Sequence, residues 1–231
     1  MRRVLLILLL ISTQAQAGPW PRGKGKVFYS VHANGEYLDD LGVIRQFGSI
    51  YGEYGVTDRI TLGIDYNGSE IETEKAIAFV RFPLGKSDRT WRFAAELGAG
   101  IVDGENVLRP GFSVGRGINW RDRSGWLTLD TRVVLGDLPS GTRIESDFTL
   151  GLNWTERFKV IFQLQGGIPS EGDNYLKFAP SVVYELRQRK PRKGRKLRKP
   201  RKGKQFIEFG ITTGLVNYDD YGAKLGIWRE F

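Results

Sequence analysis

The sequence predicts an all-β protein: a transmembrane, antiparallel, up-and-down β-barrel of about twelve strands. Three observations lead to this fold class: an export signal at the N-terminus, repeated segments in which apolar and polar residues alternate, and a last segment that ends in Phe231. Segments of about ten alternating residues, separated by turn residues, are typical of strands that face lipid on one side and a polar lumen on the other.

The first 17 residues have the pattern of a cleavable signal peptide. Two arginines precede an apolar run over residues 4–11, and Ala15-Gln16-Ala17 forms an A-x-A cleavage site. The apolar run is too short to cross a bilayer as a helix, which needs roughly 20 residues. We therefore expect residues 1–17 to be removed after export and residues 18–231 to form one barrel domain.

The composition excludes several classes of chemistry. The chain contains no cysteine, which rules out disulfides, thiol catalysis and thiolate metal sites. Its single histidine is His32. No segment after the signal is apolar enough for a transmembrane helix. We expect no metal site and no cofactor.

Alternation is clearest in the middle of the chain. Apolar residues occupy every second position from Trp91 to Ile101, and Arg92 and Glu96 are among the residues between them. The same pattern follows Ile144, and again Phe158. One face of each segment suits lipid and the other suits a polar interior.

Twelve such segments can be counted, an even number, as bacterial single-chain barrels require. Turn residues lie between them, including Asn67-Gly68, Asp103-Gly104 and Ser140-Gly141. A closed barrel is expected because open sheet edges in hydrocarbon would leave backbone groups unpaired. The predicted strands cover residues 24–33, 44–56, 59–66, 74–84, 90–101, 107–118, 125–135, 143–154, 157–167, 174–186, 205–215 and 221–231.

The tryptophans provide a check on the strand count. If both termini are periplasmic, odd strands run outward and even strands run inward. All six tryptophans then lie at periplasmic strand ends, as an interfacial aromatic girdle requires. They are Trp20, Trp91, Trp120, Trp126, Trp154 and Trp228, and Phe158, Tyr184 and Phe231 join them.

A soluble exported β-sandwich is the main alternative fold, since alternation alone does not say which face is buried. Strands of about ten residues are longer than the usual five or six, which favours the membrane barrel. The final segment, Tyr221 to Phe231, resembles the C-terminal assembly signal of outer-membrane proteins. We therefore expect the barrel-assembly machinery to recognise this strand, and outer-membrane lipid and lipopolysaccharide to surround the protein.

Charged residues on the polar faces are the candidate lumen lining. An arginine on the lipid face would cost roughly 2–4 kcal/mol at the midplane, so these charges should point inward. Two interpretations stay open: rings of charge that select solutes in a narrow pore, or ion pairs that fill the interior. No segment is long enough for a separate plug domain. The candidates are Arg59, Asp65, Arg92, Glu96, Asp130, Arg132, Glu145, Asp147, Lys159, Lys177, Glu185, Glu208 and Lys224.

His32 raises the possibility of a lipid-modifying hydrolase. The stretch Val31 to Gly35 resembles the His-x-Ser-Asn-Gly stretch of outer-membrane phospholipases, but Ala33 stands at the serine position. A serine nucleophile needs a nearby base, so the expected pair is missing here. A lumen or rim histidine is the simpler interpretation.

A basic segment, residues 187–204, interrupts an otherwise mildly acidic body. It holds twelve lysines and arginines and no acid, and the unit K-P-R-K-G occurs twice. Like charges, proline and glycine predict a mobile loop, which the strand count places in the periplasm. An anionic periplasmic partner is expected, rather than nucleic acid. The residues concerned are Arg187, Lys190, Arg192, Lys193, Arg195, Lys196, Arg198, Lys199, Arg201 and Lys202.

Three short stretches resemble the phenol-degradation-pathway (MetA-pathway) family of outer-membrane transporters. They are a strand–turn–strand unit from Tyr51 to Gly63, a similar unit from Leu152 to Phe158, and the terminal strand from Leu225 to Phe231. The resemblance covers about a quarter of the chain and implies an outer-membrane transporter. It supplies no catalytic or binding residue.

Together these observations predict a passive channel or transporter for small molecules or ions in the outer membrane of a Gram-negative bacterium. Two alternatives remain at this stage. One is a lipid hydrolase that uses His32. The other is a structural barrel whose basic loop binds an anionic partner.

Overall fold

The computed structural model describes most of the chain after residue 17. The described residues are 18–38, 42–69, 72–86, 89–138, 141–187, 203–217 and 220–231. The predicted signal peptide and residues 188–202 of the basic segment lie outside them.

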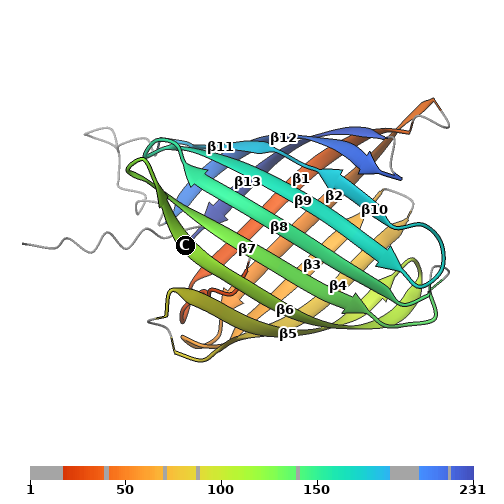
Figure 1. Cartoon of the computed structure of the whole chain (residues 1–231), viewed down its shortest axis with the longest axis horizontal. Helices are drawn as coiled ribbons and strands as arrows, with labels where there is room; N and C mark the ends of the chain where they lie inside the picture. Colours follow the sequence, from red (N-terminus) through yellow and green to blue (C-terminus); the bar gives the residue numbers. More distant parts are fainter. Residues whose placement is uncertain are drawn as a thin grey trace, which may run out of the picture.

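The chain forms one antiparallel sheet that closes on itself, because β13 pairs with β1 on one side and with β12 on the other. Neighbouring strands are consecutive in sequence, as in an up-and-down barrel (Figure 1). The strands are β1 (Val27–Leu38), β2 (Val43–Gly55), β3 (Thr61–Gly68), β4 (Thr73–Leu84), β5 (Trp91–Val102), β6 (Glu105–Trp120), β7 (Arg123–Val134), β8 (Arg143–Asn153), β9 (Phe158–Pro169), β10 (Tyr175–Phe178), β11 (Ser181–Glu185), β12 (Lys204–Val216) and β13 (Tyr221–Glu230).

The thirteen strands occupy twelve positions in the wall. Both β10 and β11 pair with β9 and β12, so together they form the single strand predicted over 174–186. Pro180 separates them because it has no N–H to donate to the ladder. The ladder continues across the break: the Ala179 N–H donates to the Gln163 carbonyl at 2.8 Å, and the Ile211 N–H to the Pro180 carbonyl at 3.0 Å. The predicted twelve-stranded barrel is confirmed.

The largest error in the predicted boundaries is in the first strand, which covers 27–38 instead of 24–33. It starts later because Gly23 and Gly25 have positive φ angles and form a turn. It continues past Asn34-Gly35, which resembles a turn in sequence but pairs with Phe47 and Gln46 of β2. Cross-strand pairing overrides the local turn preference of these two residues.

The predicted turns have mixed outcomes. Asp103 and Gly104, with φ angles of 51° and 83°, make the two-residue connection between β5 and β6, as expected for a tight hairpin. Asn67-Gly68 is instead the end of β3, where the pairing with β4 shifts register. Ser140 lies outside the described residues.

The outer face of the wall is apolar and the inner face is polar. On β12 and β13 the outward residues Phe209 and Leu225 are 54% and 58% exposed, whereas the inward Glu208 is 2% exposed. A soluble sandwich would have the opposite arrangement, so that alternative is excluded, and the outer face is suited to lipid. Among the described residues no helix is long and apolar enough to cross a membrane.

We call the end where β1 begins and β13 stops the terminal end, and the opposite end the distal end. All six tryptophans lie toward the terminal end, as predicted. The girdle interpretation holds for Trp91, Trp120 and Trp154, which are 42–45% exposed. It is wrong for Trp126 and Trp228, which are buried inside the barrel, and for Trp20, which packs against the same interior cluster.

Candidate functional site: the barrel lumen

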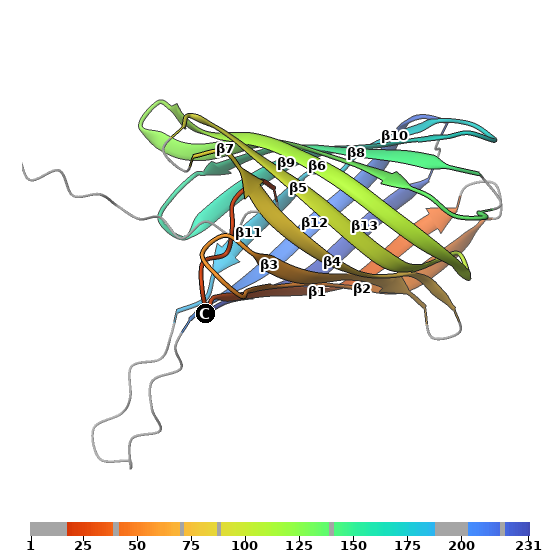
Figure 2. The ribbon, with the colours of Figure 1, turned by 90° about the horizontal axis from the view of Figure 1, so that it is seen from below.

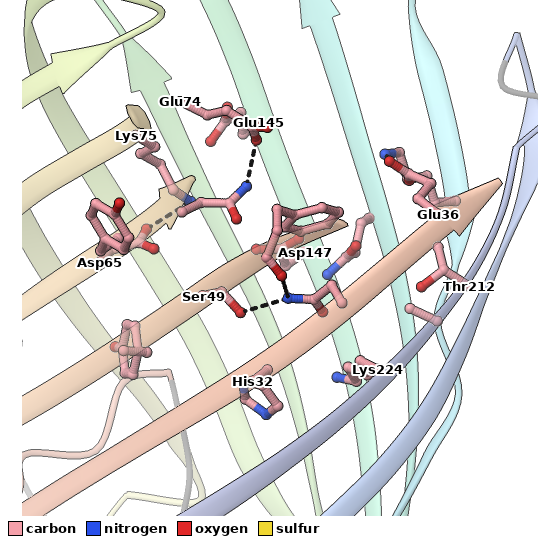
Figure 3. A pocket seen from close by; sticks show the side chains of 18 of the residues that line it. His32, Glu36, Ser49, Asp65, Glu74, Lys75, Glu145, Asp147, Thr212 and Lys224 are labelled. Atoms are coloured by element: carbon pink, nitrogen blue, oxygen red, sulfur yellow. Dashed lines mark hydrogen bonds and ion pairs between the residues drawn. The ribbon is translucent and has the colours of Figure 1, made fainter. Parts of the chain in front are cut away.

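The lumen contains a large polar cavity. Its upper part, toward the distal end, has a volume of about 530 Å³, and a deeper part has about 290 Å³. The two parts form one continuous space, because both are lined by His32, Asp65, Asp147 and Lys224. Figure 3 shows these four side chains around the cavity.

Toward the terminal end the lumen is filled by an apolar cluster. Six strands contribute inward residues to it, and Trp20 and Tyr51 pack against it. Gly151 leaves room for the indole of Trp126, since a Cβ at Gly151 would lie 2.1 Å from that ring. The cluster residues are Phe28, Trp126, Ile161, Val183, Phe206 and Trp228.

The segment that precedes β1 completes the closure. Residues 18–22, drawn in red in Figure 2, run inside the terminal end. The carbonyl of Gly18 accepts a hydrogen bond from Arg81 of β4 at 3.2 Å, and Arg22 forms an ion pair with Glu53 of β2. Trp20 reaches β6, where a Cβ at Gly115 would lie 2.8 Å from its ring.

We call the apolar cluster together with residues 18–22 the terminal plug. It consists of an extended segment and inward strand side chains. The lumen is therefore closed at this end without the help of a separate plug domain. The sequence of this segment has no strand or helix pattern, and nothing in it marks a lumenal position.

A network of buried charges lies next to the terminal plug. Arg81 is 2.6 Å from Glu53 on one side and 2.6 Å from Glu96 on the other. Arg81 and Glu96 are directly opposite in the β4–β5 register, so strand pairing places them together. Arg132 continues the network: it contacts Glu96 at 3.4 Å and Asp147 at 3.1 Å.

The network also reaches across the barrel. Arg109 of β6 is 2.7 Å from Asp65 of β3, and its second guanidinium nitrogen is 3.5 Å from Glu96. Buried charges are costly unless they are paired, and removal of one partner leaves an uncompensated charge. This layer therefore ties strands β2 to β8 together through the interior as well as through the wall.

His32 belongs to a second polar cluster. Its Nε2 is 2.7 Å from a carboxylate oxygen of Glu208, which also accepts a hydrogen bond from the indole N–H of Trp228 at 2.5 Å. Lys224 approaches the other oxygen at 2.7 Å. Gly226 lies opposite His32, where a Cβ would be 2.0 Å from the imidazole. In the described part of the chain, His32 has no serine partner.

Near the distal end the charges are paired, and Arg45 is 42% exposed whereas Glu36 is buried. Arg45 contacts Glu36 at 2.5 Å and Glu74 at 3.1 Å, and Arg143 contacts Glu145 at 2.9 Å. Six carboxylates and five lysines or arginines line the upper cavity. Because acidic and basic side chains are nearly equal in number, this space has little net charge.

The structure brings together most of the predicted lumen residues. Ten line the cavity, belong to the networks or enter the terminal plug: Asp65, Glu96, Asp130, Arg132, Glu145, Asp147, Lys159, Lys177, Glu208 and Lys224. Lys159 is not in open lumen, because its ammonium lies 5.0 Å from the ring centre of Phe206.

The remaining three predicted residues lie near the terminal end. Glu185 is the last residue of β11. Arg92 has the same inward phase on β5 as Ala94 and Glu96. The placement of Arg59 is corrected: it is in the exposed turn between β2 and β3, because strand alternation ends at Gly55.

Sequence reasoning missed Arg22, Glu53, Arg81 and Arg109. The inward face of β4 carries Ile77 and Phe79 as well as Arg81, so apolar residues occupy both faces and the phase is ambiguous. One signal was present. A lone arginine within an apolar strand should point away from lipid, which places Arg81 inside.

The ends of the basic segment emerge at the terminal end. Arg187 follows β11 and Lys204 begins β12. The other residues predicted to bind an anionic partner lie outside the described residues: Lys190, Arg192, Lys193, Arg195, Lys196, Arg198, Lys199, Arg201 and Lys202.

No protein-family model and no curated protein matches the chain. Solved structures do match. The KdgM porin has a TM-score of 0.59 at 10% identity, with 87% of this chain and 99% of that chain covered. The NanC porin has a TM-score of 0.58 at 10% identity, with 86% and 98% covered. An outer membrane channel from Pseudomonas putida F1 has a TM-score of 0.52 at 10% identity, with 94% and 100% covered. At this identity the likeness concerns the fold, and the fold of this chain is that of the outer-membrane porins.

Proposed function

We propose that the protein is an outer-membrane channel for the passive diffusion of small polar molecules. The observation that carries the proposal is the continuous polar cavity inside a closed barrel whose outer face is apolar. Twelve strands leave more interior space than eight, where side chains fill the barrel. The near balance of charge around the cavity favours polar solutes of low net charge over strongly charged ones.

The structural neighbours support this function by their titles, which call two of them porins and one an outer membrane channel. One title describes the KdgM porin in complex with disordered oligogalacturonate. We do not propose that ligand for this chain, because six carboxylates and five lysines or arginines line the upper cavity. Membership of the MetA-pathway family is likewise a proposal, and it rests on three short sequence stretches.

The proposed orientation places the terminal end in the periplasm. The A-x-A site before Gly18 and the strand that ends in Phe231 support export and insertion by the barrel-assembly machinery into a Gram-negative outer membrane. Solutes would then enter the polar cavity from outside the cell.

Passage through the terminal end requires the terminal plug to rearrange. Residues 18–22 are the part most suited to move, since they pair with no strand. Gly23 and Gly25, with φ angles of 78° and 73°, form a turn between this segment and β1. The ion pair between Arg22 and Glu53 and the hydrogen bond from Arg81 to the Gly18 carbonyl help to hold the segment in place.

Planar-bilayer conductance tests the proposal directly. The matched proteins are the wild type and a variant that lacks residues 18–22 but keeps the signal peptide. We expect the wild type to show small or rare conductance steps and the deletion variant to show larger and more frequent ones. If both are silent although heat-modifiable migration on gels shows folded barrels, the channel function is wrong.

The hydrolase alternative is not favoured by the position of His32. The imidazole faces the lumen and binds Glu208, whereas lipid substrates contact the outer face. Phospholipase and lipid A deacylase assays on the wild type and His32→Ala test this alternative. Only activity in the wild type that is lost in the variant would support a hydrolase.

We also propose that the basic segment binds an anionic periplasmic partner. Its two ends lie at the terminal end, which supports a periplasmic location in the orientation given above. Deletion of residues 188–202 should leave the barrel folded and abolish co-purification of that partner. Unchanged co-purification would contradict this interpretation.

A further inference from the structure

The arginines inside the barrel differ from those on its outer rim in their carboxylate partners, although Arg22, Arg45 and Arg81 also lie over aromatic rings. Six lumenal arginines each form an ion pair with a carboxylate: Arg22, Arg45, Arg81, Arg109, Arg132 and Arg143. Five others lie at the terminal end and stack on aromatic rings. In the part of the chain that the structure describes, none of these five has a carboxylate partner.

The five stacked pairs extend around the outer rim from β5 to β13. The distance from the guanidinium carbon to the ring centre is between 4.0 and 5.2 Å in each pair. We call this set the arginine belt. Its pairs are Arg116 with Trp91, Arg121 with Trp120, Arg123 with Trp154, Arg157 with Tyr184, and Arg229 with Phe231.

Stacking leaves the donors of a guanidinium available. The ring covers one face of the planar group, while the N–H bonds point outward in its plane. Arg157 uses one nitrogen on the carbonyl of Glu185 at 2.8 Å. The belt thus presents positive charge at the rim, beside rings that cover one face of each guanidinium.

The depth of the belt identifies the acceptor. The five rings are 41–45% exposed and lie at the edge of the apolar outer face. Aromatic residues at this position mark the boundary between hydrocarbon and headgroups. Phosphate groups are the acceptors that a phospholipid leaflet offers at that depth, and arginine binds phosphate through two parallel N–H bonds.

Charge at the opposite end of the barrel differs in sign. The exposed charges in the described distal connections are mainly acidic: Glu72, Glu105, Asp137, Glu171 and Asp173. A basic belt at one end only is therefore matched to an anionic surface at that end. From this geometry we infer that the arginine belt binds the phosphate groups of phospholipids in the leaflet that borders the terminal end.

Native mass spectrometry of the purified, folded barrel with added phosphatidylglycerol tests the inference. The belt variant is Arg121→Gln, Arg123→Gln and Arg157→Gln together. The control removes the same charge from exposed residues at the same end that have no ring partner: Arg59→Gln, Lys86→Gln and Arg89→Gln. Each lost arginine should weaken lipid binding by about fivefold, given about 1 kcal/mol per basic residue near an anionic surface.

The wild type and the control should retain phosphatidylglycerol, and the belt variant should lose most of it. Equal loss in the control and belt variants, or no loss in either, would overturn the inference. If the belt variant does not fold, the matching Arg→Lys triple variant replaces it, and it should bind phosphatidylglycerol more weakly than the wild type because the planar fork is lost. Binding by the lysine variant that equals that of the wild type would overturn the inference.

Two competitors distinguish the source of the phosphate. Inorganic phosphate at the same concentration should not displace the lipid, because it lacks acyl chains that contact the apolar face. Lipopolysaccharide should bind the wild type and the belt variant equally well. Preferential loss of lipopolysaccharide from the belt variant would overturn the leaflet assignment. None of these measurements depends on conductance, so the inference and the channel function fail separately.

Discussion

The two ends of the barrel are built from the same strands but have opposite interiors. At the terminal end inward residues such as Trp126, Val183 and Phe206 pack like the core of a soluble protein. Toward the distal end, β9 and β13, which also contribute to that cluster, carry Gln165 and Lys224 beside a polar cavity. The wall, the register and the lipid-facing side chains therefore do not determine whether the lumen is open. Whether the lumen is open at a given level is determined by the inward residues at that level.

The charges outside the barrel differ between the ends as well. Basic groups stacked on rings surround the terminal end, whereas acids dominate the described distal connections. A packed interior and a basic exterior thus occur at the same end. Variants at the two ends should separate these contributions, and the following predictions run from the largest expected effect to the smallest.

Replacement of Arg81 by methionine should have the largest effect on stability. The variant leaves Glu53 and Glu96 as buried carboxylates without their shared partner, which should lower the free energy of unfolding by about 3–5 kcal/mol. At the distal end Arg45 is itself 42% exposed, and Lys177 stays 3.8 Å from the buried Glu36 when Arg45 is replaced, so Arg45→Met should cost less, about 1–2 kcal/mol. Denaturant unfolding in lipid vesicles, followed by tryptophan fluorescence, measures both. Equal losses would show that the two ends do not differ in this way.

Substitution of Gly151 by alanine should disturb the terminal plug. A Cβ at this position would lie 2.1 Å from the ring of Trp126, so the indole must shift, at a cost of about 1–3 kcal/mol. Gly117→Ala is the matched control, because the nearest atom to its Cβ is 4.0 Å away. The same unfolding assay should show a lower midpoint for Gly151→Ala alone. A lower midpoint for the control would point to backbone effects instead.

Truncation of Trp20 to alanine should open the terminal end. The side chain bridges the apolar cluster and the wall at Gly115, and its removal leaves space in the terminal plug. Single-channel conductance should rise in this variant. Trp154→Ala, which removes an outward ring, should leave conductance unchanged. A rise in both variants would mean that the terminal plug is not the barrier.

Neutralisation of Lys75 should produce the smallest effect. Lys75 lines the cavity and lies 3.0 Å from Asp65. Lys75→Gln leaves an excess of negative charge, so the pore should become slightly more cation-selective. The reversal potential in a salt gradient measures this shift. Lys86→Gln, on an exposed turn, should produce none, and a shift toward anions in Lys75→Gln would contradict the assignment of the cavity as the conducting path.

The sequence predicted the wall of the barrel better than its interior. Alternation depends on the two faces of each strand, which are local properties, so eleven of the twelve predicted strands coincide closely with those in the structure. The terminal plug depends on which inward residues meet across the barrel. Phe28 and Trp126 belong to one cluster although 98 residues separate them in sequence, and alternation says nothing about such distances.

The charged lumen shows the same limit. Glu96 and Arg132 were predicted to face inward because arginine and glutamate are costly in lipid. Their contact at 3.4 Å spans two strand positions and follows from register, which a single sequence does not define. Arg22 lies outside every strand, so no periodic pattern identifies it. Which lumenal charges form ion pairs with each other is therefore determined by the closed barrel.

The position of Trp20 also has a consequence for the order of assembly. The apolar cluster against which it packs includes Phe28 of β1 and Trp228 of β13, the two strands that meet at the seam of the barrel. The site is complete only after this seam has closed, although Trp20 precedes every strand in the chain. Burial of this indole is consequently a late event in folding, and its fluorescence would report the moment at which insertion into the bilayer is finished.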